Sequence, residues 1–152
     1  MTPPTGLTQR TLILTVLAVA AVSLAAAGDH ATEDVALGGY CPVAYVAMGK
    51  AVEGDSMIVS EYEGKTYYLA NAKAKKMFDK SPGSYVVAYD GFCATGVAHD
   101  MKVESNPTLF VVREGKTYLF SKSEAKAMFT ADEAGTVAKA DKNWPAIAHQ
   151  GH

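Results

Sequence analysis

An internal duplication limits what this chain can fold into more than any other feature. Residues 63–78 and residues 114–129 are identical at 9 of 16 positions when they are aligned at an offset of 51. Both segments begin with the sequence EGKTY and end with MF. A period that occurs only twice indicates a duplicated unit, because solenoid arrays need several stacked repeats. The sequence therefore predicts two half-domains with the same local structure.

Each half is expected to contain a β-hairpin followed by a helix. Short runs rich in β-branched and aromatic residues flank a Glu-Gly turn in both halves, which is the pattern of paired strands. Behind each hairpin, apolar residues at i, i+3 and i+4 give a helix one buried face. These residues are Ala74, Met77 and Phe78 in the first half and Ala125, Met128 and Phe129 in the second. Strands followed by helices, with no long βαβ crossover, predict a small single-domain α+β fold. The strands are expected at residues 57–62 and 66–69, and again at 109–112 and 117–120.

Capping residues and a proline limit the predicted helices. Asn71 can accept a hydrogen bond from the first turn of the helix after the first hairpin. Ser121, with a glutamate three residues later, has the spacing of a capping box before the second helix. A further helix is expected over residues 131–143, and Trp144-Pro145 would end it.

The two cysteines of the chain occupy equivalent places in the duplication. Residues 38–45 are predicted to form a turn-rich loop with a short apolar piece, and this loop contains Gly39-Tyr40-Cys41. Residues 85–89 are predicted to be extended and lead into Gly91-Phe92-Cys93, the same pattern at an offset of 52.

Residues 1–27 have the pattern of an export signal. Arg10 precedes an apolar run, and Ala25-Ala26-Ala27 offers small residues for cleavage. The folded part is therefore expected in a periplasm or outside the cell. The alternative is an uncleaved membrane anchor, because the run of about 17 residues is near the lower limit for crossing a bilayer. The predicted organisation is a signal at 1–27, a lead-in at 28–37, a domain at 38–146 and a tail at 147–152.

The charge of the chain argues against nucleic acid as a partner. The formal net charge is −2. The lysines are spread along the chain, whereas nucleic-acid-binding domains gather basic residues in a patch or stripe.

Several motifs together resemble the YHS-domain family, in its exported branch whose opening reads Gly-Tyr-Asp-Pro-Val-Ala-Tyr. The resemblance extends over residues 38–146 and includes the opening GYCPVAY, the EGKTYYLANAKAKKMF segment, SPGSY and the closing ADKNWP. YHS domains are related to TRASH metal-binding modules, so the resemblance implies heavy-metal handling, often of copper, and a metal-handling partner protein. The family's cysteine positions hold Ala44, Ala70 and Ala74 here, whereas Cys41 replaces the aspartate of the opening motif.

Four residues are the candidate metal ligands: Cys41, Cys93, His99 and Met101. Thiolate, imidazole and thioether together suit Cu(I), a soft ion, whereas zinc takes four nitrogen, sulfur or carboxylate ligands. The duplicated loops are expected to bring both cysteine sulfurs to one place. The predicted function is storage, delivery or resistance for a soft metal, with a copper ion bound. For His99 and Met101 the alternative is a surface loop and a core methionine.

Two other uses of the cysteines follow from export and from spacing. A Cys41–Cys93 disulfide would close a loop of about 51 residues and stabilise the fold by about 3–4 kcal/mol, in a non-catalytic structural or interaction module. Cys93 and His99 could also act as nucleophile and base. No motif for an oxyanion hole or a third orienting group accompanies them, so the chain is not expected to be an enzyme. His30, His149 and His152 are expected in solvated tails.

Overall fold

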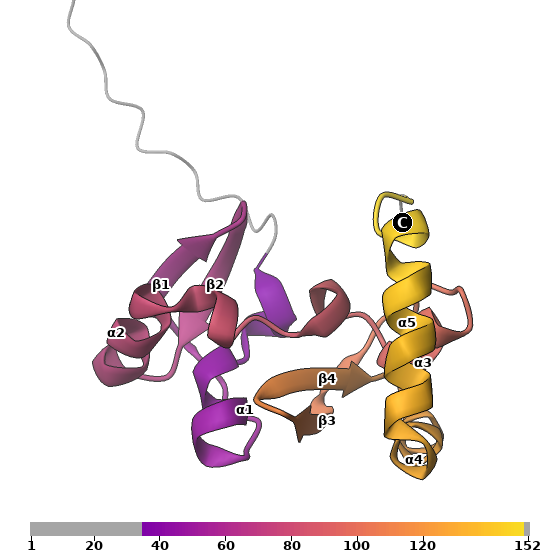
Figure 1. Cartoon of the computed structure of the whole chain (residues 1–152). Coiled ribbons are helices and arrows are strands. Elements are labelled where there is room, and N and C mark those ends of the chain that lie inside the picture. Colours follow the sequence, from indigo (N-terminus) through magenta and orange to yellow (C-terminus); the bar gives the residue numbers. More distant parts are fainter. Residues whose placement is uncertain (1–34, 151–152) are drawn as a thin grey trace, which may run out of the picture. The chain divides into compact units, whose positions relative to one another are not determined.

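The computed structural model describes residues 35–150 (Figure 1). The predicted signal at 1–27, His30 and His152 lie outside these residues. In chain order the described elements are η1 (Ala36–Gly39), α1 (Pro42–Met48), β1 (Asp55–Tyr62), β2 (Lys65–Leu69), α2 (Ala72–Lys80), η2 (Pro82–Ser84), η3 (Ala88–Gly91), α3 (Ala94–Ala98), β3 (Asn106–Arg113), β4 (Lys116–Phe120), α4 (Ser123–Ala131) and α5 (Glu133–Ile147), where η is a 3-10 helix. Helices and two antiparallel hairpins confirm the predicted small α+β fold. No helix within residues 35–150 is long and apolar enough to cross a membrane.

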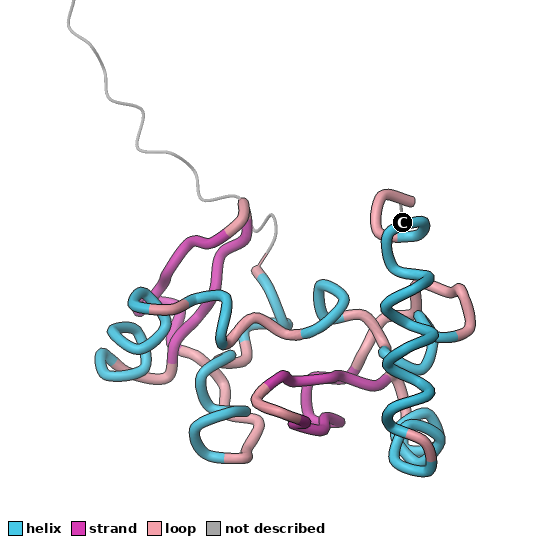
Figure 2. The backbone as a smooth tube through the Cα atoms, viewed as in Figure 1, coloured by secondary structure: helices cyan, strands magenta, loops and turns pink. Residues whose placement is uncertain are grey.

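The two hairpins repeat one another in detail and form separate two-stranded sheets (Figure 2). Both strand pairs are interrupted at the same place of the repeat, after Asp55 in β1 and after Asn106 in β3. The side chains of these two residues hold the irregular turns: Asp55 Oδ1 accepts from the N–H of Met57 at 2.8 Å, and Asn106 Oδ1 accepts from the N–H of Thr108 at 2.9 Å. The duplication predicted from the sequence therefore includes the irregularities of the strands.

The segments before the hairpins differ from the prediction. Residues 38–45 do not form only a loop with an apolar piece, because the short helix α1 begins at Pro42. Proline suits the first position of a helix, since its fixed φ is helical and its missing N–H would have had no partner there. Residues 85–89 are likewise not extended throughout, because η3 begins at Ala88. The turns η1 and η3 are equivalent, and Gly39 and Gly91 both have a φ of 86°.

The predicted helix ends are only partly right. Asn71 caps α2 as predicted, since its Oδ1 accepts from the N–H of Ala74 at 2.9 Å. The capping box at Ser121 is wrong, because α4 is preceded by Lys122 and no side chain caps it. The predicted end at Trp144-Pro145 is also wrong, because α5 continues to Ile147 with Pro145 inside it. Ile147 is 2% exposed, so burial of its side chain favours the extra turn.

A small apolar cluster joins the two halves of the described chain. Its buried residues are Tyr45 of α1, Val87 and Leu119 of β4. The Tyr45 hydroxyl donates to the carbonyl oxygen of Pro107 at 2.8 Å, and its ring contacts that of Phe110 with a centroid distance of 4.9 Å. Burial raises the pKa of Tyr45 far above its ordinary value, so the hydroxyl keeps the proton that it donates.

Valine in place of Thr117 of β4 is expected to stabilise the protein. Thr117 is 1% exposed, and its Oγ1 has no hydrogen-bond partner within residues 35–150. A buried hydroxyl without a partner costs about 1–3 kcal/mol, and valine has nearly the same shape without it. We expect the free energy of unfolding in urea to rise by about 1 kcal/mol for Thr117→Val. Thr66→Val, at the equivalent and half-buried position, should change it by less than about 0.5 kcal/mol. A destabilised Thr117→Val variant would contradict this reading.

Candidate functional site

The structure does not bring the two cysteines together. Both are free thiols, and both are buried, with exposed fractions of 0% for Cys41 and 1% for Cys93. They belong to different core clusters, and each lines a cavity of its own half that shares no lining residue with the other. The expectation of one common place for both sulfurs is therefore wrong, and no disulfide joins them. The reason is that each cysteine side chain packs into the core of its own half, whereas the halves meet through the cluster of Tyr45, Val87 and Leu119.

Each cysteine is held in the same way by the backbone. The N–H of Cys41 donates to the carbonyl of Val52, and the N–H of Cys93 donates to the carbonyl of Val103, both at 2.8 Å. Each cysteine also immediately precedes a short helix, α1 or α3. The duplication therefore gives two equivalent thiol positions, one in each half.

Three of the four predicted ligands converge on one cavity in the C-terminal half. Cys93, His99 and Met101 all line this cavity, which has a volume of about 330 Å³. Helix α3 separates the cysteine from the histidine by a little more than one turn, and a tight turn then brings Met101 back. In this turn the N–H groups of His99 and Met101 both donate to the carbonyl of Gly96, at 2.9 Å and 3.0 Å.

A fourth soft donor in this cavity was not expected from the sequence. Met128 of α4 lines it too, although the i, i+3, i+4 pattern placed this residue on the buried face of its helix. Its exposed fraction is 53%, and that of Met101 is 52%, so neither methionine is a core residue. The equivalence of Met77 and Met128 in the duplicated segments was the only sequence signal that could have suggested a shared role. We call Cys93, His99, Met101 and Met128 the C-terminal sulfur–imidazole cluster.

The polar surroundings of the C-terminal sulfur–imidazole cluster contain no carboxylate. The other polar residues that line the cavity are Thr95, Ser121 and Lys122. The Ser121 hydroxyl donates to the sulfur of Cys93 at 3.5 Å. Groups of three or more His, Cys, Asp and Glu that could hold a metal are absent from residues 35–150. Hard ions that require carboxylate ligands are therefore poorly suited to this cavity.

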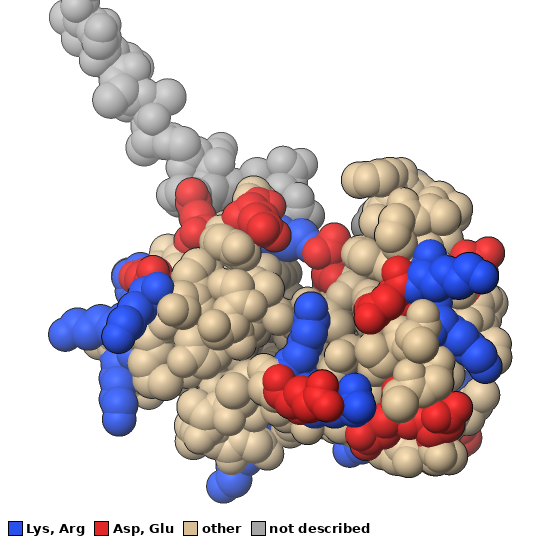
Figure 3. Space-filling view, in the orientation of Figure 1, with Lys and Arg blue, Asp and Glu red and all other residues tan. Residues whose placement is uncertain are grey.

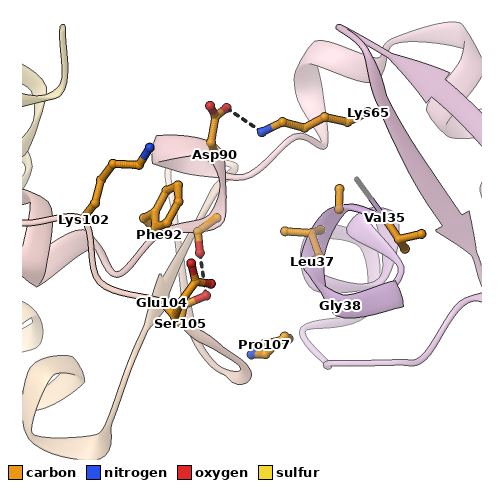
Figure 4. Close-up of a pocket in the computed structure, with 12 residues that line it drawn as sticks. Val35, Leu37, Gly38, Lys65, Asp90, Phe92, Lys102, Glu104, Ser105 and Pro107 are labelled. Atoms are coloured by element: carbon orange, nitrogen blue, oxygen red, sulfur yellow. Dashed lines mark hydrogen bonds and ion pairs between the residues drawn. The ribbon is translucent and has the colours of Figure 1, made fainter. Parts of the chain in front are cut away.

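A further cavity of about 500 Å³ is lined by apolar and charged residues (Figure 4). Lys65 and Asp90 form an ion pair across it at 3.2 Å, and the Ser105 hydroxyl donates to the carbonyl of Gly91 at 2.5 Å. The ammonium of Lys102 lies 4.7 Å from the centre of the Phe92 ring. None of the predicted ligands lines this cavity, and basic and acidic side chains are interspersed on the face of the molecule that Figure 3 shows.

The positions at which the YHS resemblance places cysteines lie together. Ala44, Ala70 and Ala74 all line the cavity beside Cys41 in the N-terminal half. These side chains offer no donor atom. Comparisons of the chain with protein-family models, with curated proteins and with solved structures found no match, so the YHS resemblance rests on the sequence motifs.

Proposed function

We propose that this chain is an exported, non-catalytic protein that binds Cu(I) for storage, delivery or resistance. The observation that carries the proposal is the convergence of Cys93, His99, Met101 and Met128 on one cavity. A thiolate, an imidazole and two thioethers are all soft or borderline donors, and together they favour Cu(I) over ions that prefer oxygen.

The burial of the donors suits uptake and transfer of the ion. The Cys93 sulfur lies inside, at 1% exposure, whereas about half of each methionine side chain is exposed. An incoming ion would therefore meet the thioethers first and the thiolate last. A metal-handling partner protein could reach the same two methionines from the outside. The single charge of the thiolate balances that of a monovalent ion, so the bound pair adds no net charge to a carboxylate-free cavity.

The proposal is tested by Cu(I) titration of the reduced exported protein against a competing chelator. A Cys41→Ser background leaves Cys93 as the only thiol, and we expect it to bind one equivalent. Adding Cys93→Ser should lower the affinity at least about 100-fold, since the only anionic donor is lost. Replacing Met101 and Met128 by leucine should weaken binding at least about tenfold while keeping side-chain volume.

Met57→Leu is the matched control, because Met57 of β1 is 87% exposed and lines neither cysteine cavity. It should leave Cu(I) binding unchanged. Circular dichroism of each variant establishes that the fold is retained. If the Cys41→Ser protein is folded and reduced but binds no Cu(I), the proposed function is wrong.

A further inference from the structure

We infer that the N-terminal half carries a second, independent soft-metal site, formed by Cys41, Met48 and Met77. This inference rests on the proposed function, because it assigns to the chain a second ion of the same chemical class. The three side chains line one cavity of about 460 Å³. A thiolate with two thioethers makes an all-sulfur donor set, which is suited to Cu(I) or Ag(I). We call these three residues the N-terminal sulfur cluster.

The positions of the three donors resemble those of the C-terminal cluster. Cys41 is buried next to the start of α1, Met48 is the last residue of this helix, and Met77 lies on α2. Met48 is 60% exposed and Met77 is half-buried, so the thiol is again inside and the thioethers are nearer to solvent.

The duplication gives independent support, because the two cavities are lined from equivalent places. Cys41 corresponds to Cys93, and Met77 corresponds to Met128 at an offset of 51. The described chain contains five methionines, and four of them line one or the other cysteine cavity. Only Met57 does not.

Packing alone does not account for this arrangement. Methionine often fills gaps in apolar cores, where its flexible side chain is buried. Met48, Met101 and Met128 are each more than half exposed, so they fill no core. Their common property is a position beside a buried thiol, which is the arrangement that a soft-metal site requires.

The two clusters differ in one donor. The N-terminal cavity contains no histidine and no carboxylate, and its polar lining residues are Asn71 and Lys73. The C-terminal cavity contains His99. The ion in the N-terminal cavity should therefore be bound by sulfur alone, and the ion in the C-terminal cavity by sulfur and nitrogen.

The test is the number of Cu(I) ions bound by four reduced forms of the exported protein, measured against a competing chelator. We expect two equivalents for the unchanged chain, one for Cys41→Ser, one for Cys93→Ser and none for the double variant. In the Cys93→Ser background, Met48→Leu with Met77→Leu should weaken the remaining ion at least about tenfold, whereas Met57→Leu should have no effect. X-ray absorption of Cu(I) in Cys93→Ser should show a first shell of sulfur only.

The possible outcomes separate this inference from the proposed function. If the unchanged chain binds one ion and Cys41→Ser binds it equally well, the N-terminal site is wrong while the proposed function stands. If it binds one ion that either substitution removes, the cysteines share a site, and two independent sites are excluded. A nitrogen shell in the Cys93→Ser protein would also overturn the all-sulfur assignment. Absence of binding in every form would refute both.

Discussion

Replacing Phe129 by alanine is expected to lower the free energy of unfolding by about 3–5 kcal/mol. Phe129 of α4 is completely buried, and its ring contacts those of Tyr118 and Phe120, with centroid distances of 5.2 Å and 5.0 Å. Alanine would leave a cavity between α4 and β4 that these rings cannot fill without leaving their own positions. Small domains have total stabilities of about 5–15 kcal/mol, so this loss is a large share. Denaturant unfolding followed by circular dichroism measures it.

Phe78→Ala makes the equivalent change in the N-terminal half. Phe78 is 1% exposed and packs against the ring of Tyr67 at 4.9 Å. If the halves unfold as one unit, both variants should lower the midpoint of the same single transition. Met128→Ala is the control on α4, because this side chain is mostly exposed and should cost less than about 1 kcal/mol. A Phe129→Ala variant no less stable than Met128→Ala would show that Phe129 is not part of the core of this half.

Gly54→Ala is expected to destabilise the protein by about 3 kcal/mol or more, at the upper end for overpacking. A Cβ atom at Gly54 would lie 2.4 Å from both the carbonyl carbon and the carbonyl oxygen of Tyr68. These are backbone atoms of β2, so the clash cannot be relieved by rotating a side chain. The strand or the loop must move, and the bond from the N–H of Gly54 to the carbonyl of Gly39, 2.8 Å long, would be strained. Thermal unfolding gives the measurement.

Ser56→Ala tests whether this effect is specific to the close approach at Gly54. Ser56 lies two residues further along, is exposed, and should tolerate alanine within about 0.5 kcal/mol. The equivalent of Gly54 in the second half is Ser105, which already carries a Cβ atom. The requirement for glycine is therefore particular to the first half. Equal stabilities of Gly54→Ala and Ser56→Ala would rule out the steric contact.

The hairpins and the helices that follow them could be predicted because their signals are local. The Glu-Gly turns, the alternating strands and the Asn71 cap each involve residues close in sequence. The end of α5, which was predicted wrongly, depends on longer-range packing. Pro145 reads locally as a stop, but α5 packs along α3, where the side-chain amide of Asn143 donates to the carbonyl of Val97 at 3.1 Å (Figure 1). Tertiary contact keeps this helix continuous past the proline.

The candidate site, too, could be predicted where its residues are close in sequence and could not be predicted where they are distant. The convergence of Cys93, His99 and Met101 could be anticipated, because one short helix and a turn connect them. The place of Met128 could not, because helical periodicity gives the faces of α4 and not the cavity that one of them borders. The separation of Cys41 from Cys93 depends on how the halves dock, which no repeat in a single sequence specifies.

Tyr45 joins the halves, but the equivalent residue of the second half does not, so the two cavities are free to change separately. The residue that corresponds to Tyr45 at an offset of 52 is Val97, which lies in the core of its own half. Two identical subunits would carry any substitution twice, so neither cavity could acquire a donor without the other. In a single polypeptide each cavity can be altered alone. A histidine beside one thiol and none beside the other is the kind of specialisation that such a fusion permits.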